Sequence, residues 1–188
     1  MDTNDLKERI AETLVEGILR RARYRVALAG RQSRVRNLLK IESDGFMPDL
    51  LAWKQTDGER VLAPQLIPID IRYRADVSSA LRQEQLQLAS AAEQWHNIYF
   101  VFVTEHPEAG RSCFQVVDIR QCAPGAPWHT VDLHEVGELD IYWHTVEEYE
   151  GLVKMIFPVL SGCARGGVSA RKPGQRLPGR ITAVRVSR

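Results

Sequence analysis

The stretch Ile-Pro-Ile-Asp-Ile-Arg-Tyr-Arg, residues 67–74, alternates between apolar and charged side chains over most of its length. Successive side chains of a β-strand point to opposite faces of the sheet. The pattern therefore predicts a strand whose isoleucines and Tyr73 lie on one face. Asp70, Arg72 and Arg74 lie on the other face, so that acidic and basic groups lie side by side.

An aspartate also stands at the start of the preceding apolar stretch, Met-Pro-Asp-Leu-Leu-Ala-Trp (47–53). The pair Asp57-Gly58 between the two stretches favours a hairpin turn, because glycine tolerates positive φ. We therefore expect two antiparallel neighbouring strands that carry Asp49 and Asp70 close together. Two such carboxylates form a suitable place for a divalent cation.

The rest of the chain predicts helices and further strands around this pair. Residues 5–22 repeat apolar side chains at helical spacing, with Glu8 and Glu12 at the border of the apolar stripe. Further predictions are a strand at 24–29, a helix at 76–95 with Glu84 and Gln85 at its margins, buried strands at 98–103 and 114–119, and a helix at 149–160 that Pro158 should kink or end. The fold class is α/β, with a central mixed β-sheet flanked by helices.

Length and charge divide the chain into two parts. We expect one domain over residues 1–161 and a disordered basic tail over 162–188, rich in glycine, proline and arginine. The tail holds seven Arg or Lys residues and no acid, which leaves 18 basic against 24 acidic residues in 1–161. The net charge of +1 therefore hides an acidic domain and a basic tail.

Several protein classes are excluded by missing patterns. There is no apolar run of membrane-spanning length, and the N-terminal residues are acidic and polar, so we expect no membrane span, no secretion signal and a cytoplasmic protein. Cys113, Cys122 and Cys163 lack the spacing of a disulfide framework or a structural zinc site. The glycine-rich phosphate-binding loops and the serine-hydrolase motif do not occur either.

A basic run without Asp or Glu extends from Arg20 to Lys40. Clustered cations of this kind suit a phosphate backbone. The predicted nucleic-acid contacts are Arg31, Arg34, Arg36, Lys40 and Arg74. Residues 20–23 alone have a second interpretation, since cations are also favoured at the C-terminal end of a helix.

The predicted order of helix, three strands, helix and strand, followed by further strands and a helix, resembles the PD-(D/E)xK nuclease superfamily, or restriction-endonuclease-like fold. The resemblance covers residues 5–103 and rests on Pro48-Asp49 and on Asp70-Ile71-Arg72. It implies an αβββαβ core in which Asp49 and Asp70 bind Mg²⁺ or Mn²⁺. It also implies that the first helix contributes an acid to the site, which is Glu12, with Glu8 as the second candidate. Gln85 resembles a glutamine that the helix after the motif supplies to the site in the superfamily.

Arg72 stands where this superfamily normally has a lysine. Its planar guanidinium can stabilise charge on a phosphate but cannot act as a base, because it stays protonated. Each residue also has a purely structural interpretation. Asp49 can be a turn or strand-entry residue, and Asp70 can form an ion pair with Arg72 or Arg74. Glu12 and Gln85 can be exposed surface residues.

The sequence thus favours a Mg²⁺-dependent DNA endonuclease of restriction or repair type. The alternative is a catalytically inactive module of the same fold, which acts in nucleic-acid binding or complex assembly. A third reading is an unrelated α/β domain whose acids do not converge. Whether the protein is a homodimer or a subunit of a larger complex stays open.

Overall fold

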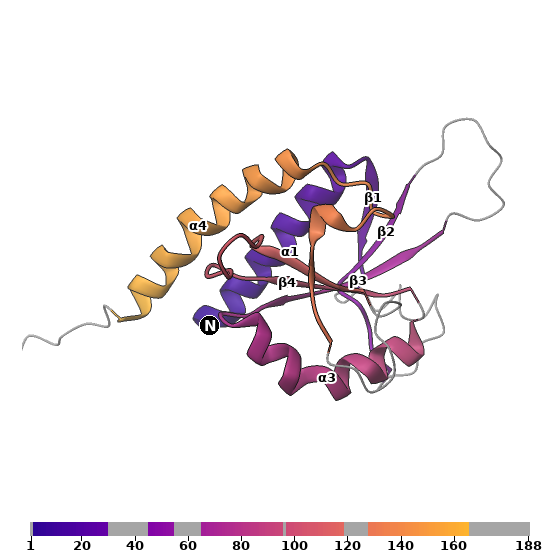
Figure 1. Cartoon of the computed structure of the whole chain (residues 1–188), viewed down its shortest axis with the longest axis horizontal. Helices are drawn as coiled ribbons and strands as arrows, with labels where there is room; N and C mark the ends of the chain where they lie inside the picture. Colours follow the sequence, from indigo (N-terminus) through magenta and orange to yellow (C-terminus); the bar gives the residue numbers. More distant parts are fainter. Residues whose placement is uncertain (1, 30–44, 55–64, 96, 119–127, 166–188) are drawn as a thin grey trace, which may run out of the picture.

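A six-stranded mixed β-sheet with helices on both faces forms the centre of the protein (Figure 1). The computed structural model describes residues 2–29, 45–54, 65–95, 97–118 and 128–165. Its elements are α1 (Thr3–Arg21), β1 (Tyr24–Leu28), β2 (Leu50–Lys54), β3 (Ile67–Tyr73), α3 (Val77–Gln94), β4 (Tyr99–Val103), β5 (Phe114–Asp118), β6 (Val131–Asp132), η2 (Leu133–Glu135) and α4 (Trp143–Arg165). The predicted α/β class, with a mixed sheet flanked by helices, is confirmed.

The strands lie across the sheet in chain order, from β1 at one edge to β6 at the other. Among the described strands only β3 and β4 run parallel, and α3 connects them, as a parallel pair requires a crossover. The predicted antiparallel pairing of β2 with β3 is confirmed, with Leu50 opposite Ile69. The turn predicted at Asp57-Gly58 lies outside the described residues.

Each face of the sheet has its own hydrophobic core. Helices α1 and α4 cover the face that carries Ile69, Ile71 and Tyr73. Helix α3 covers the opposite face, where Phe100 and Phe102 are buried. Asp70 and Arg72 pair in register with these two phenylalanines, so they lie on the α3 face, as the alternation predicted.

Helices α1 and α4 approach each other closely at Gly17. A Cβ atom at this position would lie 2.5 Å from the Tyr149 hydroxyl oxygen. Any larger residue would therefore require the Tyr149 ring to move.

Helix α4 does not end at Pro158, contrary to one of the two outcomes predicted for that residue. The helix continues to Arg165, four residues beyond the predicted domain end at residue 161. Pro158 lies on the exposed side, whereas Val153 and Phe157 are fully buried on the sheet side. Burial of that apolar face outweighs the loss of one backbone hydrogen bond at proline.

A buried polar cluster joins the start of α1 to the end of α4. The Lys7 ammonium donates to Tyr73 Oη at 2.9 Å, to Glu105 at 2.5 Å and to Ser161 Oγ at 2.6 Å. Burial alone would raise the pKa of Glu105, but the hydrogen bonds from Lys7 and Tyr73 outweigh it and hold that pKa below its ordinary range. The cluster therefore keeps both charges buried.

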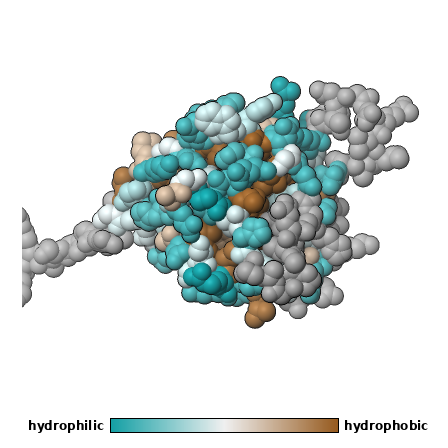
Figure 2. All heavy atoms as spheres, in the orientation of Figure 1, coloured by the Kyte–Doolittle hydropathy of each residue, from teal (hydrophilic) through white to brown (hydrophobic). Residues whose placement is uncertain are grey.

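The face of the protein seen in Figure 2 is largely polar where its residues are described. Figure 2 shows a mostly hydrophilic face with hydrophobic side chains between the polar ones. Leu86 on α3 is an exception, since it is apolar and 86% exposed. None of the described helices combines the length and apolarity that a membrane crossing needs.

Candidate functional site

A pocket of about 460 Å³ opens where the first half of α1 meets the start of β2 and the C-terminal half of β3. It is lined by Asp5, Glu8, Arg9, Glu12, Asp49, Asp70, Ile71, Arg72 and Arg74. The fold thus brings together Glu12, Asp49, Asp70, Arg72 and Arg74, which are five of the residues selected from the sequence.

The opening exists because β3 extends beyond the point at which its antiparallel neighbour β2 begins. The first residue of β2, Leu50, pairs with Ile69, so the part of β3 beyond this point has no β2 partner. The Ile71 amide is satisfied there by a side chain, since it donates to Asp49 Oδ2 at 2.8 Å. Asp49 therefore closes the end of the ladder while facing the same pocket as Asp70.

Asp70 is 7% exposed and is paired with Arg72, whose Nε donates to Asp70 Oδ2 at 2.7 Å. Burial raises the pKa of Asp70, and the neighbouring positive charge of Arg72 opposes that effect. The ion pair that the sequence left open for Asp70 is present. Asp70 lines the pocket and forms this ion pair at the same time.

Glu84 on α3 is the residue that sequence reasoning missed. Its Oε2 accepts from Arg72 Nη1 and its Oε1 accepts from Arg74 Nε, both at 2.5 Å. Burial would raise the pKa of Glu84, but the hydrogen bonds and charges of the two arginines bring it below its ordinary value. Glu84 therefore holds both guanidinium groups beside the carboxylates.

Gln85 is half-buried on α3 and is not among the residues that line the pocket. The α3 side chain that contacts Arg72 and Arg74 belongs to the adjacent residue, Glu84. The sequence placed Glu84 at one margin of the helix, and two arginines spaced by two on a strand were the signal for such a partner.

The carboxyl group of Asp49 has a strongly raised pKa. Burial raises its pKa, the nearby charge of Asp70 adds to the effect, and the pKa reaches about 7 despite the opposing hydrogen bond from Ile71. The charges of Glu12 and Glu8 contribute in the same direction. These four acids all line the same pocket.

The raised pKa of Asp49 predicts a pH-dependent stability in the absence of metal. The folded state keeps a proton up to about pH 7, whereas the unfolded chain releases it near pH 4. Between these values the folded state binds more protons, so the contribution of this group to the free energy of unfolding decreases as pH rises. Urea denaturation of wild type and Asp49→Asn in EDTA, from pH 4 to 8, should show this decrease only in wild type. An equal dependence of the unfolding free energy on pH in wild type and Asp49→Asn would contradict a raised pKa of Asp49.

The donor set of the pocket fits a hard divalent cation. Hydrogen bonds to described residues use only Oδ2 of Asp49 and Oδ2 of Asp70, so both Oδ1 atoms remain available. The lining contains five acids and three arginines, and Glu84 offsets part of the arginine charge. Carboxylate oxygens in an acidic setting are ligands that Mg²⁺ and Mn²⁺ prefer.

Most of the predicted nucleic-acid contacts lie outside the described residues, namely Arg31, Arg34, Arg36 and Lys40. Arg74 is described and lies at the pocket, where its Nη1 is 3.4 Å from Glu8. Its side chain is 31% exposed, so part of the guanidinium faces solvent.

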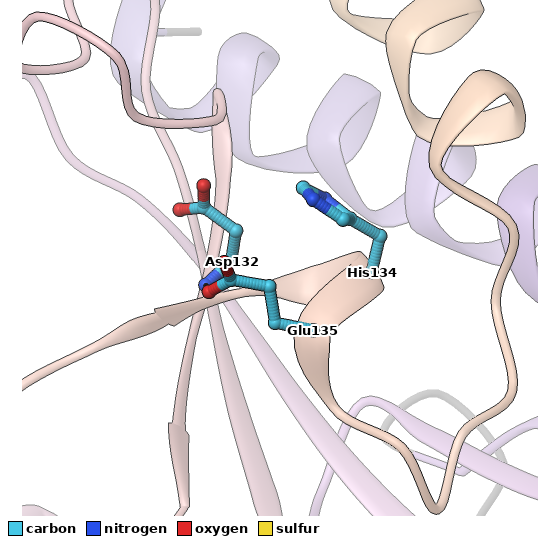
Figure 3. Close-up of side chains that lie close together, drawn as sticks. All are labelled: Asp132, His134 and Glu135. Atoms are coloured by element: carbon cyan, nitrogen blue, oxygen red, sulfur yellow. The ribbon is translucent and has the colours of Figure 1, made fainter.

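A second group with metal-binding side chains lies at the turn from β6 into η2 (Figure 3). Asp132, His134 and Glu135 offer ligand atoms within 4.8 Å of one another. Asp132 already accepts from Arg111 Nε at 2.8 Å, and Glu135 accepts from the Asp132 amide in a capping box. Those contacts explain the cluster as a cap of the short helix, without a cation.

Comparison with family models, with curated proteins and with solved structures gave no match for this chain.

Proposed function

We propose that this protein is a metal-dependent nuclease of restriction-endonuclease-like fold, which hydrolyses phosphodiester bonds of DNA with Mg²⁺ or Mn²⁺. The observation that carries the proposal is the convergence of Asp49, Asp70 and Glu12 with two arginines in a single pocket. A structural role for any one of these acids does not require the others to be there. Metal-assisted hydrolysis requires such a group of residues.

In this proposal Asp49 and Asp70 would hold the cation, and Glu12 lines the same pocket. The bound metal would acidify a water molecule and neutralise charge on the phosphate. Arg72 and Arg74, held by Glu84, contribute a second positive region next to the carboxylates. Their guanidinium groups suit non-bridging phosphate oxygens and stabilise the charge that develops during attack.

The second candidate function is a catalytically inactive module of the same fold that binds nucleic acid or assembles a complex. One observation favours it: Arg72 Nε is bonded directly to an oxygen of Asp70, which a catalytic metal would also approach. An arginine charge there can replace the cation instead of assisting it.

Cleavage of supercoiled plasmid, single-stranded DNA and branched DNA, each with Mg²⁺, Mn²⁺ or EDTA, separates the two functions. An active nuclease cleaves at least one of these substrates with metal and none in EDTA. Metal binding by isothermal titration calorimetry gives a readout that does not depend on turnover. Absence of both cleavage and metal binding in wild type would reject the proposal.

Arg72→Lys gives a further prediction. If wild type is active, the variant should cleave about tenfold more slowly, because lysine cannot contact Asp70 and Glu84 at once as the planar fork does. The rate of plasmid nicking at saturating Mn²⁺ measures this. An inactive wild type that gains cleavage on Arg72→Lys would instead identify the inactive module.

A further inference from the structure

A second pocket, of about 320 Å³, lies at the other end of α1. It is lined by Arg21, Ala22, Arg23, Lys54, Asp140 and Tyr142. Arg21 follows Glu12 by nine residues of continuous helix, which corresponds to about 14 Å along the helix axis. The second pocket is therefore separate from the carboxylate pocket, and three of its residues are cations.

The three cations differ in how they are neutralised. Lys54 donates to Asp140 at 2.9 Å, and Arg21 pairs with Glu148. Arg23 has no side-chain hydrogen bond or ion pair to any described residue. It is exposed and stands next to the edge strand β1, so its charge is available to a ligand.

The backbone around this pocket adopts an unusual conformation. Among the described residues, Arg23 (φ 64°) and Asp140 (φ 48°) are the two non-glycine residues with positive φ, and both line this pocket. Arg23 follows the C-cap residue of α1, the position where glycine commonly ends a helix. Local strain of this kind is concentrated at binding sites. An arginine in a glycine position therefore indicates that its side chain has a role.

An aromatic side chain completes the pocket. Tyr142 is 65% exposed and stacks on His144 with a centroid distance of 5.6 Å and an interplanar angle of 23°. Trp143 is 61% exposed and packs edge-on against the same histidine. An exposed, supported aromatic ring beside arginine is suited to stacking on an unpaired base.

We infer that this second pocket binds single-stranded nucleic acid, with Arg23 at a phosphate and Tyr142 against the neighbouring base. The inference rests on the proposed function only in taking nucleic acid as the ligand, and it does not require catalysis. Charge alone would also attract duplex DNA, but the exposed ring favours unpaired bases. The pocket would hold a strand at a distance from the carboxylates.

Arg23→Gly tests this inference because stability and binding should change in opposite directions. Glycine relieves the positive φ, so the melting temperature should rise. Affinity for a fluorescein-labelled oligothymidylate, measured by anisotropy in EDTA, should fall about tenfold. The slope of log affinity against log salt should become less steep by about 0.7, as expected for one lost phosphate contact with a single strand.

Two variants complete the design. Tyr142→Ala should weaken oligothymidylate binding about tenfold while duplex binding changes little. Arg82→Ala, which removes an exposed arginine from α3 that lines neither pocket, should bind within about twofold of wild type. Wild-type affinity in Arg23→Gly, an equal loss in Arg82→Ala, or no oligothymidylate binding by wild type would overturn the inference.

The outcomes also separate this inference from the proposed nuclease activity. Arg23-dependent binding by a protein that neither cleaves a substrate nor binds metal would support the second pocket and reject the nuclease. Metal-dependent cleavage by a protein whose binding is unaffected by Arg23→Gly would support the nuclease and reject the second pocket.

Discussion

Asp70→Asn is expected to reduce metal-dependent DNA cleavage by at least about a thousandfold. The substitution keeps the shape of a buried side chain, but it removes the negative charge that the proposed cation needs. A loss of this size corresponds to about 4 kcal/mol in the activation free energy. Plasmid nicking at saturating Mg²⁺ measures the rate. Calorimetry should show weakened metal binding in the same variant.

Asp132→Asn is the matched control for this experiment. Asp132 is also 7% exposed and also accepts from an arginine, Arg111, at 2.8 Å, but it lies outside the carboxylate pocket. Its replacement should lower the melting temperature without a change in cleavage rate per folded molecule. Full cleavage by Asp70→Asn would contradict the metal assignment. Loss of cleavage in Asp132→Asn instead would move the metal to the cluster at η2.

Lys7→Met is expected to destabilise the fold by about 3–5 kcal/mol. The side chains of Lys7 and Glu105 are 3% and 5% exposed, so removal of the lysine leaves a buried carboxylate without its cation. Glu105 Oε2 already has no hydrogen-bond partner among the described residues. Since small domains are stable by about 5–15 kcal/mol, such a loss is a large fraction of the total. The midpoint and slope of urea unfolding at pH 7 measure it.

Lys154→Met provides the comparison for Lys7→Met. Lys154 also pairs with a glutamate, Glu150, at 3.2 Å, but its side chain is 55% exposed. Its replacement should therefore lower the free energy of unfolding by less than about 1 kcal/mol. The double variant Lys7→Met with Glu105→Gln should lose less than Lys7→Met alone, because no buried charge is left unpaired. Equal destabilisation by Lys7→Met and Lys154→Met would show that the buried pair adds nothing.

Much of the framework could be predicted from local patterns. The alternation in residues 67–74 correctly placed Asp70 and Arg72 on the face opposite Ile69 and Ile71. The spacing of apolar residues identified α1, and the continuous apolar run at 98–103 identified β4, which is buried throughout. Such patterns are reliable because the period of a helix or a strand is fixed by its own backbone geometry.

The candidate site was only partly accessible in this way. The sequence selected Asp49, Asp70 and Glu12, and the fold brings them to one pocket. Glu84 was missed as a site residue, because its position at a helix margin does not reveal that α3 crosses β3 beside Arg72 and Arg74. Lys7 lies one turn before Ala11 on the buried side of α1, yet its partners Tyr73 and Glu105 lie 66 and 98 residues away in the chain.

The sequence by itself determined which side chains share a face of each helix or strand, and therefore that acids and arginines alternate with the core on β3. The tertiary structure decided which of those charges meet. It set the offset between β2 and β3, the position of α1 over that offset, and the burial of Lys7 and Glu84 against their partners. The reason is physical: periodicity is a property of a few consecutive residues, whereas charge pairing depends on strand register and helix docking, which the packing of the two cores fixes for the whole domain at once.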